Sequence, residues 1–575
     1  MHYSPGTLIF RHSYELEQDS GKMKLAESGR IGDLEVKNRI VMAPMISNLA
    51  NPDGCTNENH IAYLEERAKG GAGMIITEYT YINGINSRGS RNESGVYNPD
   101  FIPKFRRLTE RVHSHGTKVF MQLVHAGGKA LLETNREGPM APTSTDYVGY
   151  TPREMTKDDI EPVIGDFLKA ARFAKNAQFD GIELHGAHGY LIQEFLSPSL
   201  NRREDMYGGS LDGRLKFPQE IIDAIRGELD IPLGIRLSLY EDDQDGYGPE
   251  YGLQIAESLR GIDYAHFSAG RFAPPGSSSS FYGIRTHIAE RLPRKPNITS
   301  IVVGSVTSLK DAERVLKKSD FVAVGRALLA DPYFPKKAMD SPQLIRPCIR
   351  CNQACRDLGY GEVRCTVNPD LGRELYSYFP VRLSGEISIA GAGIKGLEAA
   401  LTAAKSGFRV TLYDIRKDIG GQLLDLYDPG KKREFSSLLS YFRNALEKLG
   451  VTFVLGKKYE GPGLYCLPDV NYPEIGKGET VRIDSNIYRY HDDALRLARG
   501  HHVVMTNRSL SSLDRVRAAS YREMAMKAGI EFTSSTEGEF EVRMIERMQY
   551  DIRAAMVAGR EAFYRYLREN STDSL

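Results

Sequence analysis

The sequence predicts an α/β protein in which a (β/α)8 TIM barrel is followed by a four-cysteine segment and a Rossmann-like domain. Eight apolar strands alternate with helix-like segments over roughly the first 330 residues. Four of the six cysteines then fall close together, and a glycine-rich turn follows a later strand. A chain of 575 residues also exceeds what one hydrophobic core usually supports. We expect an extension at 1–23, the barrel at 24–340, the cysteine segment at 341–384 and an incomplete dinucleotide-binding domain at 385–575.

The expected barrel strands are short runs rich in β-branched and apolar residues. They lie at 39–44, 73–78, 118–123, 181–185, 233–238, 264–270, 299–305 and 321–328. Strands that alternate with helices indicate parallel βαβ units, and eight such units favour a closed barrel. An open doubly wound sheet would usually carry its phosphate turn after the first strand, whereas here the glycine-bearing strand ends come last.

The last two expected strands end in small residues, Gly304-Ser305 and Gly325-Arg326. Loops after strands seven and eight of this fold commonly hold a phosphate, because small residues leave backbone N–H groups accessible. The alternative is that these glycines only end strands. Two such turns at the expected places, one of them followed by arginine, favour phosphate binding.

The cysteine segment has the spacing C-x2-C-x3-C-x9-C. Its members are Cys348, Cys351, Cys355 and Cys365. Three closely set thiolates and a fourth after a short loop suit one 4Fe-4S cluster, whereas structural zinc more often takes two separated C-x2-C pairs. A cluster implies single-electron exchange with a second redox carrier, so we expect a partner protein. Cys55 and Cys466 stand alone and are expected to be small buried thiols.

The nucleotide-binding fingerprint starts with an apolar strand that runs into Gly391-x-Gly393-x-x-Gly396, and a second strand then ends at Asp414. The glycines admit a pyrophosphate at the start of a helix, and the acid binds a ribose, which predicts an adenine dinucleotide or an ADP-like ligand. No second glycine fingerprint is legible beyond Lys458. Residues 551–563 are expected to form the closing helix of the domain.

Composition limits the partners. Lys plus Arg equals Asp plus Glu at 75 each, so no net charge attracts nucleic acid or an anionic membrane. No run of eighteen apolar residues occurs, and the start of the chain carries charges where a signal peptide needs an apolar stretch. We therefore expect a cytoplasmic protein with a small-molecule substrate. The composition does not decide between a monomer and a homo-oligomer.

Several motifs together resemble one family. They are VMAPM at 41–45, GGAGMIITE at 70–78, QLVHAGGKA at 122–130, HGAHGYLIQEFLSPSLNRREDMYGGSLDGR at 185–214 and VGRALLADP at 324–332. The chain from Ile31 to Leu455 resembles the old yellow enzyme-like NADH:flavin oxidoreductases, in particular their long branch with an iron–sulfur cluster, of the 2,4-dienoyl-CoA reductase and trimethylamine dehydrogenase type. Gly420-Gly421-Gln422-Leu423 resembles the FAD domains of that branch.

The resemblance implies FMN in the barrel. Pro44 and Met45 would lie against the isoalloxazine, Gln122 would bind its pyrimidine edge, and Arg236 would lie beside N1 and O2. The role of Arg236 also has independent support, because a permanent cation stabilises the anionic reduced flavin. The alternative for Arg236 is a salt bridge at a strand end.

The resemblance further implies that His185 and His188 donate hydrogen bonds to a substrate carbonyl and that Tyr190 protonates the α carbon. Taken singly, a histidine at a strand end is more often structural, and His-x-x-His suggests a metal pair, but no third ligand motif accompanies it. The loop at 268–285 departs from the Trp-His-Glu segment of the dienoyl-CoA reductases, which puts the substrate in doubt.

The leading expectation is reduction of a carbon–carbon double bond conjugated to a carbonyl or thioester. The alternative is an amine dehydrogenase or N-demethylase that exports electrons through the cluster. His185 stands where trimethylamine dehydrogenase has a tyrosine, and the chain contains no Trp for an alkylammonium cage. A scaffold without activity is the third possibility, and the intact His185, His188 and Tyr190 motif argues against it.

Overall fold

The computed structural model describes most of the chain. The described residues are 23–145, 149–241, 245–271, 285–356, 358, 361–376, 383–426, 428–467, 480–484, 488–510, 515–534, 542–544 and 552–570. The expected extension, apart from Met23, and residues 272–284 of the 268–285 loop lie outside these ranges.

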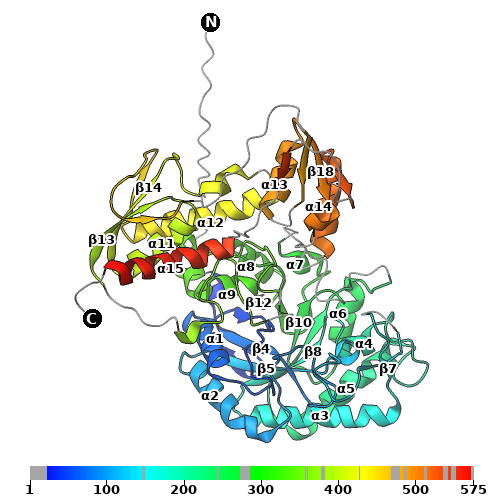
Figure 1. The fold of residues 1–575 in the computed structure, drawn as a ribbon. Coiled ribbons are helices and arrows are strands. Elements are labelled where there is room, and N and C mark those ends of the chain that lie inside the picture. Colours follow the sequence, from blue (N-terminus) through cyan, green and yellow to red (C-terminus); the bar gives the residue numbers. More distant parts are fainter. Residues whose placement is uncertain are drawn as a thin grey trace.

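A closed barrel of eight parallel strands forms the first part of the molecule (Figure 1). Its strands are β3 (Ile40–Met42), β4 (Met74–Tyr81), β5 (Lys118–Val124), β8 (Gly181–Gly186), β9 (Leu233–Ser238), β10 (Tyr264–Ser268), β11 (Ser300–Val302) and β12 (Phe321–Val324). All eight predicted strands are confirmed. The last was predicted too long, because β12 ends at Val324 and Arg326–Ala330 form helix α9.

Helices surround the barrel. They are α1 (Glu58–Lys69), α2 (Ile102–His113), α3 (Lys157–Asn176), α4 (Leu191–Leu196), α5 (Leu211–Glu228), α6 (Pro249–Ser258), α7 (His287–Arg291), α8 (Leu309–Leu316), α9 and α10 (Phe334–Asp340). Local sequence starts several of them: Thr156 and Asp159 form a capping box at α3, and Ser210 caps α5. Two short strand pairs add to this frame: β1 (Gly29–Ile31) pairs antiparallel with β2 (Leu34–Val36), and β6 (Met140–Ala141) pairs parallel with β7 (Arg153–Glu154).

The predicted nucleotide-binding fold forms around a second parallel sheet with the order β15-β14-β13-β16. Its strands are β13 (Gly385–Ala390), β14 (Phe408–Asp414), β15 (Thr452–Leu455) and β16 (Leu464–Tyr465), and its helices are α11 (Ile394–Lys405), α12 (Pro429–Lys448) and α15 (Ile552–Asn570). Gly559 lets α15 approach α11 closely, because a Cβ at Gly559 would lie 2.2 Å from the carbonyl oxygen of Lys395. The closing helix predicted at 551–563 is therefore confirmed, and it lies alongside α11 in Figure 1.

A third parallel sheet lies between β16 and α15 in the sequence, and it was not predicted from the residue pattern. Its order is β19-β18-β17-β20, formed by β17 (Thr480–Ile483), β18 (His502–Thr506), β19 (Glu531–Thr533) and β20 (Val542–Met544) with α13 (Tyr488–Leu497) and α14 (Arg515–Lys527). Such units are usually recognised by a glycine turn after the first strand. Here Asp484 follows β17, and its carboxylate accepts a hydrogen bond of 2.8 Å from the Thr506 hydroxyl on β18.

One buried carboxylate joins the parts of the molecule. Glu434 on α12 accepts hydrogen bonds of 2.8 Å from both Arg350 and Arg285. Arg350 lies between two of the clustered cysteines, and Arg285 precedes α7 of the barrel. Glu434 is fully buried, so removing its charge would leave the buried Arg350 guanidinium without this compensation.

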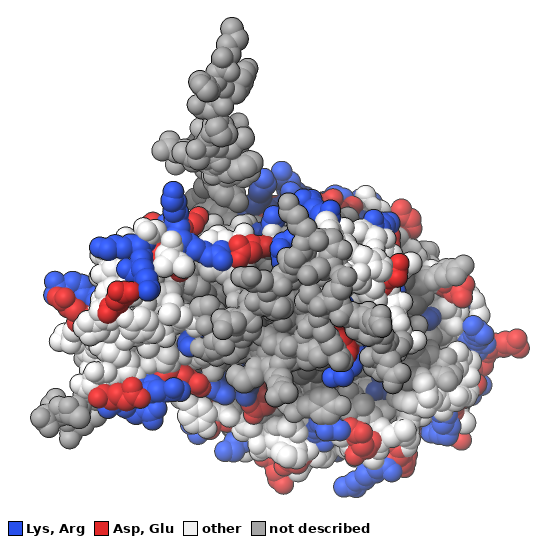
Figure 2. Space-filling model, turned by 45° about the horizontal axis from the view of Figure 1, so that its top comes forward, with Lys and Arg blue, Asp and Glu red and all other residues white. Residues whose placement is uncertain are grey.

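The surface shows no dominant sign of charge on the face in Figure 2, where Lys and Arg side chains alternate with Asp and Glu. This pattern agrees with the equal numbers of basic and acidic residues. Within the described ranges, every helix is too short or too polar to cross a membrane.

Candidate functional site

The carboxyl ends of the barrel strands bring together the residues predicted to bind a flavin. Arg236 on β9 donates from Nη1 to the carbonyl oxygen of Pro44 at 3.4 Å and from Nη2 to Ser268 Oγ at 3.3 Å. Burial lowers the pKa of Arg236 to about 10, so the guanidinium remains a cation at neutral pH. A permanent positive charge therefore lies beside the loop that carries Pro44 and Met45.

A buried carboxylate orients Gln122. Glu183 on β8 accepts from Gln122 Nε2 at 2.6 Å, and its other oxygen lies 3.1 Å from the Tyr264 hydroxyl and 3.0 Å from His266 Nδ1. Because the Gln122 side-chain nitrogen donates to Glu183, the Gln122 side-chain oxygen points away from Glu183. The sequence did not identify Glu183, although it lies two residues before His185 and so on the same face of the strand.

Three buried polar atoms in this region have no hydrogen-bond partner among the described residues: Gln122 Oε1, Arg236 Nε and His266 Nε2. A buried polar atom without a partner costs free energy, so such a group of atoms indicates a site for a polar ligand. The pyrimidine edge of FMN offers both carbonyl oxygens and an N–H group, which match one acceptor and two donor-capable nitrogens. The residues present therefore fit FMN.

The two predicted phosphate turns lie next to each other. Arg326 donates from Nη2 to Ser305 Oγ at 2.9 Å, and Gly304 has a φ of 143°. A Cβ at Gly325 would lie 3.2 Å from Met45 Sδ, so that turn also borders the residue predicted to face the isoalloxazine. The two predicted phosphate turns thus contact each other, and Gly325 lies beside Met45.

The predicted catalytic residues form one cluster at the end of β8, in which His185 and Tyr190 are buried and His188 is half-buried. The ring centroid of His185 lies 5.2 Å from that of His188 and 4.9 Å from that of Tyr190. His188 Nε2 also lies 2.7 Å from Ser268 Oγ. Burial lowers the pKa of both histidines well below the usual value and raises the pKa of Tyr190 to about 12. At neutral pH the site therefore holds two neutral imidazoles and a protonated phenol.

Cations surround this cluster. The Lys129 ammonium lies 5.5 Å from the centre of the Tyr190 ring and donates to the carbonyl oxygens of His188 at 2.6 Å and Arg271 at 2.8 Å. The charges of Arg356 and Arg236 favour the ionised form of Tyr190 and so act to lower its pKa, against the larger effect of burial. The Glu93 carboxyl acts in the opposite direction and raises the pKa of Tyr190, so charges of both signs act on this phenol.

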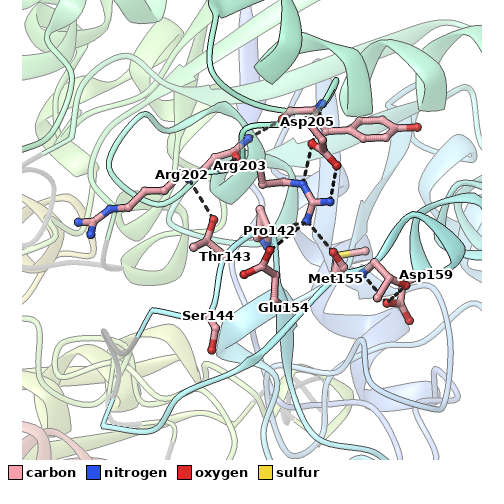
Figure 3. Close-up of polar contacts among 12 residues, drawn as sticks. Pro142, Thr143, Ser144, Glu154, Met155, Asp159, Arg202, Arg203 and Asp205 are labelled. Carbon is pink, nitrogen blue, oxygen red and sulfur yellow. Dashed lines mark hydrogen bonds and ion pairs between the residues drawn. The ribbon is translucent and has the colours of Figure 1, made fainter.

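The NRRED segment at 201–205 holds the loop that contains β6 and β7 in place through hydrogen bonds. Arg203 donates to the carbonyl oxygen of Pro142 at 2.9 Å and pairs with Asp205 through two hydrogen bonds of 3.0 and 2.7 Å. The Arg202 amide donates to Thr143 Oγ1 at 3.0 Å. Figure 3 shows the Arg202 guanidinium turned away from the Arg203–Asp205 pair. The conspicuous charges of this motif are thus largely structural, which the sequence alone did not reveal.

The four predicted cluster ligands line one cavity together with Arg326, Asn352 and Thr366. Within the described ranges, no group of three or more His, Cys, Asp or Glu side chains is arranged to hold a single metal ion. Each cysteine of a cubane binds a different iron, so its sulfur atoms lie farther apart than around one zinc. Burial raises the pKa of Cys355 to about 12, so its thiolate needs compensating positive charge. The four thiols that line this cavity are the donor set that a 4Fe-4S cluster requires.

The cluster loop contacts the predicted phosphate turn directly, because Arg326 hydrogen-bonds the Asn352 side chain. Arg326 therefore reaches from Ser305 in the barrel to a residue next to Cys351. This side chain connects the two candidate redox sites. Its position after β12 predicted phosphate binding, but it did not predict the contact with the cysteine loop.

The predicted nucleotide fingerprint also comes together. A Cβ at Gly396 would lie 1.7 Å from the Gly391 carbonyl oxygen, whereas a Cβ at Gly393 would meet no atom nearer than Gly421 Cα at 3.9 Å. Asp414 accepts a hydrogen bond of 2.6 Å from the Ala392 amide. Gln422 follows Gly421 in the short helix η6 (Gly421–Asp425), beside this turn. The open side of Gly393 fits the approach of a pyrophosphate.

Comparisons with known proteins identify two families. Residues 27–343 match the NADH:flavin oxidoreductase / NADH oxidase family, and residues 389–448 match an NAD(P)-binding Rossmann-like domain. The chain is 41% identical over 446 residues to an NADH oxidase of Thermoanaerobacter brockii, covering 74% of this chain and 67% of that protein. It is 32% identical over 467 residues to a cinnamate reductase of Clostridium sporogenes, covering 74% and 70% respectively. The matches thus span about two thirds of these relatives' lengths.

Solved structures share the fold over most of the chain. A 2-naphthoyl-CoA reductase complex has a TM-score of 0.79 at 24% identity and covers 89% of this chain and 87% of its own. Histamine dehydrogenase from Rhizobium sp. 4-9 has a TM-score of 0.79 at 22% identity and covers 96% and 97%. The expected barrel, Rossmann-like domain and family are confirmed, and this chain is an oxidoreductase with an FMN-binding barrel that belongs to the NADH:flavin oxidoreductase / NADH oxidase family.

Proposed function

We propose that this protein reduces a carbon–carbon double bond conjugated to a carbonyl or thioester. The observation that carries this proposal is the close grouping of two neutral imidazoles and one protonated phenol. These groups are the donors that such a reaction needs, and they lie next to the residues that fit FMN. FMN bound there would supply the hydride.

The residues of the chain have separate roles in this proposal. His185 and His188 donate hydrogen bonds to the substrate carbonyl oxygen, which draws electron density from the double bond and makes the β carbon electrophilic. Tyr190 delivers its proton to the α carbon. Lys129 and Arg236 stabilise the negative charge that develops on the oxygen, because they act across a buried site of low dielectric.

The charges near Tyr190 also separate the two candidate substrate classes. An alkylammonium substrate would meet Lys129 and Arg236, whereas an enone, enoate or thioester would not be repelled. Two buried carboxyl groups near the site already have partners: Glu183 is bonded to Gln122 and Tyr264, and Glu93 accepts hydrogen bonds from the Gly89 and Ser90 amides. The name of one relative, cinnamate reductase, agrees with an unsaturated carbonyl substrate. We therefore favour alkene reduction over amine oxidation.

Two further cofactors belong to the proposal. A 4Fe-4S cluster held by the four clustered cysteines would exchange single electrons with the flavin, and a partner protein would supply or receive them. FAD or an ADP-like nucleotide would bind the turn from Gly391 to Gly396 with Asp414 and Gln422 beside it. The contact of Arg326 with Asn352, beside the cysteine loop, supports electron exchange between the barrel and that loop.

The proposal is tested by anaerobic single-turnover mixing. Photochemically reduced protein is mixed with cinnamate-type enoates, cyclic enones and enoyl-CoAs, and oxidised protein is mixed with methylamines. We expect an unsaturated carbonyl compound to reoxidise the flavin. Flavin reduction by an amine, with no alkene reacting, would refute the proposal.

The role of Tyr190 has its own variant. Tyr190→Phe should slow the alkene step by roughly 100- to 10,000-fold while flavin reduction is unchanged, because only the proton donor is lost. Tyr251→Phe on α6, whose hydroxyl accepts a hydrogen bond from Arg214, is the matched control and should behave like the unaltered protein. An unchanged alkene rate in Tyr190→Phe would show that another group supplies the proton.

A further inference from the structure

A threonine hydroxyl lies against one of the four clustered cysteines. Thr366 directly follows Cys365 and is 3% exposed, and its Oγ1 lies 3.1 Å from Cys351 Sγ. Both side chains line the cavity that the four cysteines share. Thr366 is not one of the cluster ligands, and the function proposed above gives it no role.

The direction of this hydrogen bond depends on the state of the sulfur. In the thiol form, Cys351 Sγ donates to the Thr366 oxygen. A cysteine that binds iron is a thiolate and has no proton to donate. The hydrogen bond then requires the proton of the Thr366 hydroxyl. When Cys351 is a cluster ligand, Thr366 is therefore the donor and the ligand sulfur is the acceptor.

A second acceptor competes for this proton. Gln353 Oε1 lies 3.4 Å from Thr366 Oγ1, which is longer than the range of about 2.5–3.0 Å that is usual for an O–H···O bond. The Gln353 oxygen is also neutral, whereas hydrogen bonds to a charged acceptor are roughly twice as strong as neutral ones. The thiolate is thus the preferred acceptor of the Thr366 proton.

Two backbone contacts hold the segment that carries Thr366. Arg346 Nη1 donates to the carbonyl oxygen of Val367, and Asn368 Nδ2 donates to the carbonyl oxygen of Leu329 at 2.8 Å. Both contacts lie within two residues of Thr366, and Arg346 is buried. A donor that is fixed in this way loses little conformational freedom when it forms its bond.

The cavity makes one hydrogen bond count for more than it would in water. Leu329, Ile349 and Val367 contribute apolar lining, with the Arg326 side chain beside them. In such surroundings of low dielectric, hydrogen bonds and charges act more strongly. The reduction potential of an iron–sulfur cluster depends on its net charge and on hydrogen bonds to its sulfurs. A reduced cluster carries one more negative charge, so a donor stabilises it more than the oxidised cluster.

We propose that Thr366 raises the reduction potential of the cluster by donating a hydrogen bond from its hydroxyl to the Cys351 thiolate. In the reduction the cluster gains one electron from the partner protein or the reduced flavin, and Thr366 keeps its proton. The inference rests on the 4Fe-4S cluster of the proposed function and deepens it, because it names the residue that favours the reduced form.

Thr366→Val gives the first test, since it removes the hydroxyl and keeps the β-branched shape. Cluster and FMN potentials of the holoprotein are measured together in an anaerobic redox titration followed by EPR and absorbance. We expect the reduction equilibrium of the cluster to shift about tenfold toward the oxidised form, a fall of about 59 mV for one electron. The FMN potential should be unchanged. Thr366→Ser keeps a hydroxyl and should restore the cluster potential.

Thr402→Val on α11 is the matched control, because its hydroxyl donates to the carbonyl oxygen of Glu398 at 2.8 Å rather than to a cysteine. It should keep both potentials. Iron and acid-labile sulfide are counted in every variant. A full cluster with an unchanged potential in Thr366→Val would overturn the inference alone, as would an equal fall in Thr366→Ser. Absence of iron and sulfide from the unaltered protein would overturn the proposed cluster as well.

A second variant tests the same hydrogen bond if Thr366→Val does not assemble its cluster. Gln353→Met leaves Thr366 in place and replaces the competing oxygen with a thioether, which is a weak acceptor. The hydroxyl proton should then bond the Cys351 sulfur more fully, and the cluster potential should rise. A potential that falls or stays the same in Gln353→Met would contradict the inference.

Discussion

The two glycines Gly393 and Gly396 should respond to the same substitution in opposite ways. In Gly396→Ala the new methyl group would lie 1.7 Å from the Gly391 carbonyl oxygen, more than an ångström inside any normal contact, so the turn must move. Overpacking of this kind costs about 1–3 kcal/mol and should lower the unfolding temperature of this part of the chain by about 2–12 °C. We expect the adenine nucleotide to be lost as well.

Gly393→Ala should leave the fold intact. Its Cβ would meet nothing nearer than 3.9 Å, and its φ of −75° suits alanine. Stability should be unchanged or rise by about 0.4–1 kcal/mol, because alanine restricts the unfolded chain. The methyl group would nevertheless occupy the side that a pyrophosphate approaches, so nucleotide binding should fail without loss of stability.

The assay for both variants combines thermal unfolding with the adenine nucleotide and FMN released on denaturation. FMN should stay bound in each variant, since the barrel is untouched. Gly227→Ala on α5, where a Cβ would meet no atom within 4 Å, is the control and should keep both cofactors. A Gly393→Ala protein that retains its nucleotide at the normal level would refute the placement of the pyrophosphate.

Three further predictions concern the other sites. Cys365→Ser should lose a cluster of about four irons per chain while FMN stays bound; zinc without acid-labile sulfide in the unaltered protein would contradict the cluster. His185→Ala combined with His188→Ala should abolish charge-transfer absorbance with phenols. In the unaltered protein, phenol affinity should be constant from pH 8 to 6, because the lowered pKa values keep both imidazoles neutral. NADH and NADPH should reduce the isolated chain slowly in anaerobic stopped-flow mixing, because Asp484 stands where a second pyrophosphate turn would lie; complete bleaching within milliseconds would show a working nicotinamide site.

The barrel and the first nucleotide turn were predictable because each has a strong local pattern. All eight barrel strands are buried apolar runs, and the glycines at 391, 393 and 396 follow directly from the packing of a turn against a helix. The third sheet was not predictable from such patterns. Its first strand ends in Asp484 rather than in glycine, so the usual signal of a nucleotide-binding unit is missing.

In the candidate site, too, the residues of a local motif were predictable and the residues brought in from distant segments were not. His185, His188 and Tyr190 stand close together in the sequence, and their motif identified them. Tyr79 and Lys129 reach Tyr190 only because the barrel closes and brings their segments beside the end of β8. Tyr79 lies in β4, where every other residue is buried, so nothing in the sequence separates it from the core.

The position of α15 has a consequence for biosynthesis. This helix packs against α11, where Gly559 lies on the backbone of Lys395, although some 150 residues separate the two in the chain. After the barrel has emerged from the ribosome, all residues of the third sheet must therefore be synthesised before residues 552–570 emerge. Until then the apolar face of α11 that receives Phe563 and Met556 stays uncovered. The nucleotide-binding part of a nascent chain is thus exposed to aggregation for longer than the barrel, and chaperones would have to protect it for that interval.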